Sequence, residues 1–122
     1  MPWYYNPHIG GIKIPPHLHD QLRRQVQTYE RTKTWYPKVS IKLRFKAQFC
    51  YLDSCENGVD IFPLARLRYF PSQRWSLALF TYSHERYEPC MFAGGEDTGT
   101  IQQAIDICEL YLDSKGLTVN NM

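Results

Sequence analysis

The hydrophobic pattern of the chain changes its period near residue 38, and this change limits what the chain can fold into. Between residues 16 and 31, apolar side chains recur every three or four positions, which is typical of one face of an amphipathic helix. From residue 39 to residue 45 they alternate with polar side chains, as in a strand with one buried and one exposed face. The order predicts an α+β domain rather than an all-helical or all-strand one.

Four further segments have the composition of strands, and short turn sequences separate them. We expect these strands at residues 48–54, 62–70, 75–82 and 86–92, with a loop at residues 55–60. Because the connections are short, neighbouring strands should pair antiparallel, giving a five-stranded meander over residues 38–92. The segment 75–82 is apolar on both faces, which favours an interior strand, and Pro89 favours an edge position for the last strand.

Helices are predicted on both sides of this sheet in the sequence. Pro15 and Pro16 introduce a helix over residues 16–32. Thr100 and Gln103 have the spacing of a capping box, which predicts a second helix over residues 100–115 that ends at Gly116. With 122 residues, the chain is expected to form a single domain in which both helices cover one face of the sheet.

The first 15 residues are predicted to form an ordered arm. Their density of proline and glycine excludes a regular helix. Trp3, Tyr4 and Tyr5 make the arm unusually apolar, so we expect it to pack on the domain or on a second copy of the chain. An aromatic arm and an exposed sheet edge favour a protein partner or a homodimer.

Several segments in this order resemble a family of small uncharacterised bacterial domains. The resemblance covers about residues 15–112. It is carried by the prolyl helix start at residues 15–21, a basic strand with its hairpin partner, the segments 63–69 and 75–77, the pair Arg86-Tyr87 and a terminal helix. The resemblance implies a helix, an antiparallel meander and a second helix, and it implies no activity.

Charge is distributed unevenly along the chain. Residues 1–52 hold nine Lys or Arg and two Asp or Glu, whereas residues 53–122 hold five and ten. Cations also alternate with aromatic side chains on the polar face of the predicted sheet, a combination that single-stranded nucleic-acid platforms use. The candidate residues for binding a nucleic acid or an acidic partner are Lys38, Lys42, Arg44, Phe49, Tyr51, Arg66 and Arg68. The alternative is that they form an ordinary solvated sheet face.

Signals for catalysis and for metal binding are weak. His17 and His19 are two residues apart at a helix start, where their side chains diverge, and the cysteines lack zinc-site spacing. A hydrolase would need His84 beside the thiol of Cys50 or Cys90, which sequence spacing does not establish. No glycine-rich segment matches a phosphate loop. We therefore expect no metal and no cofactor.

The terminal segments and the cysteines favour a cytoplasmic protein. No run of about 18 apolar residues is present, and the first residues lack the basic and apolar regions of a secretory signal. The four cysteines are then expected to be reduced thiols in the core. Taken together, the sequence predicts a non-catalytic binding module that acts on a protein partner or by self-association. Nucleic-acid binding is the alternative, and a Cys/His hydrolase is a distant third.

Overall fold

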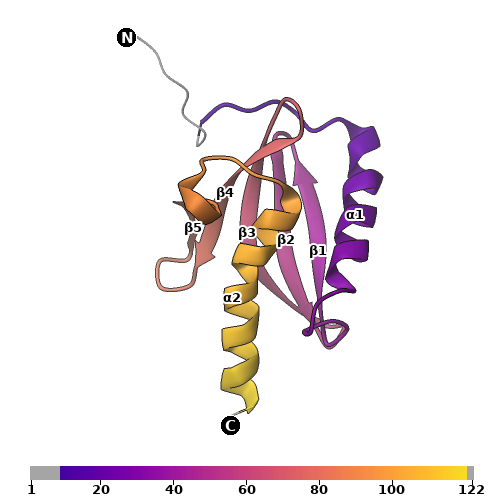
Figure 1. Ribbon diagram of the computed structural model, residues 1–122, viewed down its shortest axis with the longest axis vertical. Coiled ribbons are helices and arrows are strands. Elements are labelled where there is room, and N and C mark those ends of the chain that lie inside the picture. The colour runs from indigo at the N-terminus through magenta and orange to yellow at the C-terminus, as the bar shows by residue number, and fades with distance from the viewer. Residues whose placement is uncertain (1–8, 121–122) are drawn as a thin grey trace.

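The protein is a two-layer α+β domain with both helices on the same face of an antiparallel sheet (Figure 1). The structure is a computed structural model that describes the backbone of residues 9–120 and the side chains of residues 9–110. The sheet order β1-β2-β3-β4-β5 is a simple meander, so the predicted fold class is confirmed. The elements in chain order are α1 (Pro16–Glu30), β1 (Val39–Lys46), β2 (Phe49–Glu56), β3 (Asp60–Phe70), β4 (Arg74–Thr81), β5 (Arg86–Cys90), the short 3-10 turn η1 (Ala93–Gly95) and α2 (Ile101–Asn120).

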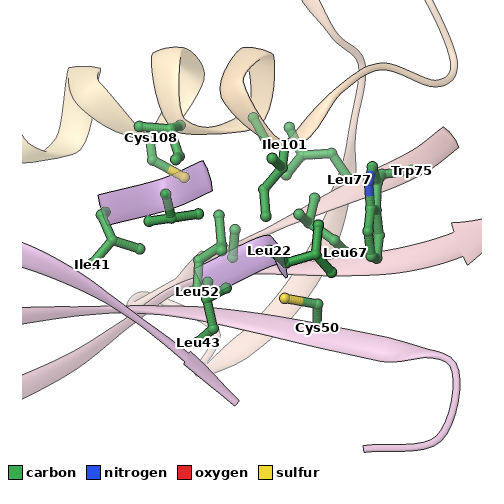
Figure 2. Packing of buried hydrophobic residues seen from close by; sticks show 14 of the residues in the cluster. Leu22, Ile41, Leu43, Cys50, Leu52, Leu67, Trp75, Leu77, Ile101 and Cys108 are labelled. Carbon is green, nitrogen blue, oxygen red and sulfur yellow. The ribbon is translucent and has the colours of Figure 1, made fainter. Parts of the chain in front are cut away.

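The hydrophobic core fills the space between the sheet and the two helices (Figure 2). Leu22 of α1 and Ile105 of α2 are fully buried, and Leu52 and Leu67 face them from the central strands. Burying a leucine or isoleucine side chain stabilises the fold by about 1.5–3 kcal/mol. The alternating pattern of the strands therefore directs their apolar side chains toward the helices and leaves their polar side chains on the opposite face.

The N-terminus of α2 has the predicted capping box. The Thr100 backbone N–H donates to Gln103 Oε1 at 2.8 Å, and the Gln103 N–H donates to Thr100 Oγ1 at 3.1 Å. These two bonds satisfy N–H groups that the first turn of a helix leaves without partners. The helix itself continues to Asn120, so the predicted end at Gly116 is wrong. A glycine inside a helix costs only about 1 kcal/mol, which does not stop it. No helix in the described part of the chain is both long and apolar enough to cross a membrane.

The second hairpin is tighter than predicted. Residues 55–60 were expected to form a loop, but β2 continues to Glu56 and β3 begins at Asp60, its partner in the ladder. Asn57 and Gly58 make the turn with φ angles of 55° and 77°, the left-handed region that Asn and Gly tolerate best. A short turn of this kind extends the pairing of both strands, and it brings Asp53 well inside β2.

Glu30, the last residue of α1, covers part of the outer edge of β1. Its side chain is buried, and Oε1 accepts a hydrogen bond of 2.8 Å from the backbone N–H of Ile41. Burial raises the pKa of the Glu30 carboxyl above its usual value, against the opposing effects of the Ile41 hydrogen bond and of nearby cations. The Glu30 side chain therefore satisfies an N–H group of the edge strand β1 that would otherwise be open to pairing with another chain.

The segment before α1 crosses the end of the sheet and belongs to the domain. The N–H of Ile12 donates to the Tyr69 carbonyl and that of Ile14 donates to the Ala47 carbonyl, both at 3.0 Å. The Ile14 side chain is only 1% exposed. Gly11 adopts a φ of +92°, and a Cβ atom there would lie 2.9 Å from the Tyr69 carbonyl oxygen. The close approach of the two backbones therefore requires glycine at this position.

Candidate functional site

The sheet face that is turned away from the helices gathers cationic and aromatic side chains, and we call it the open face. In the ladder Arg44 pairs with Tyr51, and Tyr51 pairs with Arg66. In the next row Phe49 pairs with Arg68. Because paired residues of an antiparallel ladder project to the same side, all five share this face. Lys42, one strand position from the core residue Ile41, lies on it as well and is exposed.

The three arginines lie over aromatic rings. The guanidinium carbon of Arg44 lies 4.6 Å from the centroid of Tyr51. Arg66 lies 4.6 Å from the centroid of Phe49 and 5.4 Å from that of Tyr87, and Arg68 lies 4.8 Å from that of Phe49. At such distances the ring quadrupole attracts the cation, by about 0.5–1 kcal/mol at exposed sites. This attraction holds the flexible arginine side chains against the aromatic rings of the sheet.

Two aromatic residues of the open face were not among the sequence candidates. Tyr87 of β5 pairs with Phe80 of β4, and their ring centroids are 5.1 Å apart. Tyr87 also meets Tyr51 of β2 edge-on, with ring centroids 5.5 Å apart, although two strands of the sheet lie between β5 and β2. The sequence signal for Phe80 is its single step from Leu79, which packs against the core, and the side of Tyr87 follows from its pairing with Phe80. The aromatic part of the face thus extends from β2 to β5.

The charges of the three arginines are compensated unequally. Arg44 forms two hydrogen bonds with the buried carboxylate of Asp53. Among the side chains that the structure describes, no carboxylate forms an ion pair with Arg66 or Arg68. Burial, and next the neighbouring charge of Arg66, lower the pKa of the Arg68 guanidinium. The part of the open face around Phe49 therefore carries two adjacent positive charges that attract an anion.

The other sequence candidates lie elsewhere. Lys38 precedes β1, and its carbonyl accepts a hydrogen bond from Asn57 N–H at the far end of the hairpin. Trp3, Tyr4 and Tyr5, the proposed self-association arm, lie outside the described residues. Self-association through them stays a prediction.

The opposite charges of the two helices meet at a second polar cluster, away from the open face. Lys33, just after α1, contacts Asp106 at 3.1 Å and Glu109 at 2.9 Å on α2. The Tyr29 hydroxyl donates to Asp106, and the Trp35 ring N–H donates to Glu109 at 3.3 Å. The hydrogen bond to Glu109 and the neighbouring acids raise the pKa of Lys33. This cluster joins the two helices, so part of the charge asymmetry of the sequence is paired within the fold.

Among the described residues, His84 forms no hydrogen bond with a cysteine thiol. Burial raises the pKa of both Cys50 and Cys108 to about 12, so their thiols stay protonated and are poor nucleophiles. Burial also raises the pKa of Cys90. His84 lies in the β4–β5 hairpin with Nδ1 3.3 Å from Glu88 Oε1. All four cysteines are free thiols, and no group of three or more metal-ligating side chains is found among the described residues.

Comparisons of the chain with protein-family models, with curated proteins and with solved structures give no match. The resemblance to small uncharacterised bacterial domains therefore stays a prediction. The functional argument accordingly depends on the geometry of the open face.

Proposed function

We propose that this protein is a non-catalytic binding module that holds an unpaired nucleic-acid strand on the open face of its sheet. The observation that carries this proposal is the stacking of three arginines on the rings of Phe49, Tyr51 and Tyr87, on a face that neither helix covers. Cations supply contacts to phosphate, and ordered rings and guanidinium planes supply surfaces for bases. The combination suits a ligand that presents a phosphate and an exposed base within a few ångströms of each other.

A single strand fits this surface better than a duplex does. In a duplex the bases are paired and stacked on each other, so that side chains of a flat sheet cannot stack on them. An unpaired strand offers the faces of its bases beside its phosphates. The guanidinium carbon of Arg66 lies within 5.4 Å of two ring centroids, which matches that close spacing of phosphate and base.

An acidic protein segment would also be attracted to Arg66 and Arg68. It would use their charge and make little use of the half-buried rings of Phe49, Tyr51 and Tyr87. The continuous aromatic surface from β2 to β5 favours the nucleic acid. We also propose a cytoplasmic location, which the four free cysteines support.

The proposal is tested by fluorescence anisotropy with labelled 12-nucleotide RNA and DNA strands, titrated at several salt concentrations. We expect binding that weakens steeply with salt, because each phosphate contact contributes about 0.7 to the slope of log K against log salt for a single strand. Arg66→Ala should weaken binding and reduce that slope by about 0.7 to 1. Arg24→Ala removes the same charge from an exposed position on α1 and should leave affinity unchanged.

A competing acidic ligand is tested in the same assay. Polyglutamate should displace the strand weakly, and a duplex of the same sequence should bind less tightly than its separate strands. Salt-independent binding, or equal loss of affinity in Arg24→Ala and Arg66→Ala, would refute the proposal. Binding of polyglutamate that exceeds that of every oligonucleotide would assign the face to an acidic protein partner instead.

A further inference from the structure

Arg44 differs from the other two arginines of the open face in the way it is held. Its Nε donates to Asp53 Oδ2 at 2.5 Å, and one of its terminal nitrogens, Nη2, donates to Oδ1 at 3.2 Å. The Arg44 side chain is 56% exposed, whereas that of Asp53 is 5% exposed. The carboxylate thus lies beneath the surface and holds one edge of an arginine whose other parts face outward.

Asp53 and the Tyr87 hydroxyl are polar partners of Arg44, and they determine which of its donors can reach a ligand. A guanidinium has five N–H groups, and Asp53 accepts from the Nε–H and from one N–H of Nη2. The outer edge, formed by Nη1 and the second N–H of Nη2, presents two parallel donors. Tyr51 lies 4.6 Å from the guanidinium carbon and the Tyr87 hydroxyl is a further polar partner of Arg44, so the side chain is held in place before any ligand binds. Such order lowers the entropy that binding would cost.

Charge compensation changes which acceptor this fork prefers. Asp53 neutralises much of the local charge of Arg44 and would repel a phosphate placed beside it. Arg66 and Arg68 form no ion pair with a carboxylate in the described part of the chain, so they are the stronger phosphate sites. A neutral group with two adjacent acceptors suits Arg44 better. Guanine has such a pair in O6 and N7, and arginine bound to these two atoms is the commonest base-specific contact.

We propose that Arg44, positioned by Asp53, is a specificity-determining residue that recognises the O6 and N7 edge of an unpaired guanine, while Arg66 and Arg68 bind the phosphates of the same strand. This inference depends on the proposed function and adds base preference to it. Asp53 acts as a positioning residue, since both of its carboxylate oxygens accept hydrogen bonds from the arginine.

The experiment compares oligouridine 12-mers that carry one central guanosine, adenosine or cytidine. We expect the wild-type protein to bind the guanosine strand about 5- to 150-fold more tightly than the others, the range of one good bidentate contact. In Arg44→Lys the guanosine preference should fall to near one, whereas Lys42→Arg, at an exposed position of the same strand, should keep it. Arg66→Ala should weaken binding of all strands by a similar factor and keep the preference.

A change in the ligand tests the same contact without risk to the fold. Replacing guanosine by 7-deazaguanosine removes the N7 acceptor and should lower wild-type affinity, whereas Arg44→Lys should not distinguish the two strands. Asp53→Asn should reduce the guanosine preference although Arg44 is still present, and its folding is checked by circular dichroism. A preference for cytidine or adenosine, no preference, or a guanosine preference that survives Arg44→Lys would overturn this inference and leave the proposed function standing. Failure of every strand to bind would refute the proposed function itself.

Discussion

The two faces of the sheet are built from the same five strands and are stabilised in different ways. On the covered face Leu52 and Leu67 are completely buried against the helices. On the open face Phe49 and Tyr51 of β2 are only half-buried and lie against arginine side chains. The comparison separates two roles, because substitutions on one face should change mainly stability and those on the other mainly binding.

The largest effect is expected from Leu52→Ala on the covered face. The substitution removes buried methyl groups and leaves a cavity, which costs about 2–5 kcal/mol of unfolding free energy. Lys42→Ala, on the opposite face of the adjacent strand, should change stability by less than about 0.5 kcal/mol because its side chain is exposed. Urea denaturation of both variants measures the difference, and equal losses would contradict the division between the faces.

The second effect concerns two phenylalanines on opposite faces. Phe49→Ala removes the ring that carries Arg66 and Arg68, and we expect affinity for a single strand to fall about 5- to 150-fold, as for loss of one stacked base. Phe45 projects to the covered side, where it stacks on His19 of α1 with 4.0 Å between ring centroids. Phe45→Ala should destabilise the fold and leave affinity for the strand intact. Both variants are compared by anisotropy under conditions in which circular dichroism shows them folded.

A smaller effect is expected at the helix start that supports the covered face. Thr100→Ala removes one bond of the capping box at α2 and should lower the unfolding free energy by about 1 kcal/mol. Ser83→Ala, in an exposed turn, serves as the control. Binding to the open face should be unchanged in both variants, so a loss of affinity in Thr100→Ala would show that α2 contributes to the ligand site.

The smallest effect is a pH dependence of the unfolding free energy that arises from Glu30, which lies against the edge strand β1. Because burial raises the pKa of Glu30 in the folded protein, its contribution to stability is full in acid and is lost as pH rises through that raised value. Glu30→Gln keeps an acceptor for Ile41 N–H and carries no charge. Its stability relative to the wild type should therefore increase as pH is raised from 4 toward 7. Denaturation at several pH values measures this trend, with Glu85→Gln, an exposed turn residue, as the control.

Local alternation was enough to predict which residues lie on which face of β1, of β2 as far as Leu52 and of β3 from Ala65 onward, but it placed Leu64 with the arginines, whereas Leu64 is buried in the core. Arg66 and Arg68 occupy the side opposite Leu67, as their spacing predicts. The capping box at Thr100 and the turn at Asn57 are likewise encoded within a few residues.

Features that depend on register between strands could not be predicted in this way. The ladder between β2 and β3 shifts at Leu52 and Asp53, and a bulge of this kind follows from the pairing of whole strands. The ion pair of Asp53 with Arg44 joins residues that are diagonal rather than directly opposite in the ladder. The contact between Tyr51 and Tyr87 needs the order of four strands. The proposed recognition of a base by Arg44 therefore had no counterpart in the sequence pattern.

The segment that enters the domain ahead of α1 links the two faces mechanically. The Gly10 carbonyl accepts a 2.8 Å hydrogen bond from Arg68 Nη1. Ile14, in the same segment, is buried in the core. If a local fluctuation detached this stretch, it would loosen Arg68 and admit water to the interior in the same event. An anion bound to Arg68 should consequently make that local opening less frequent. Ligand binding on the open face would then stabilise the packing of Ile14 in the core on the other side of the sheet.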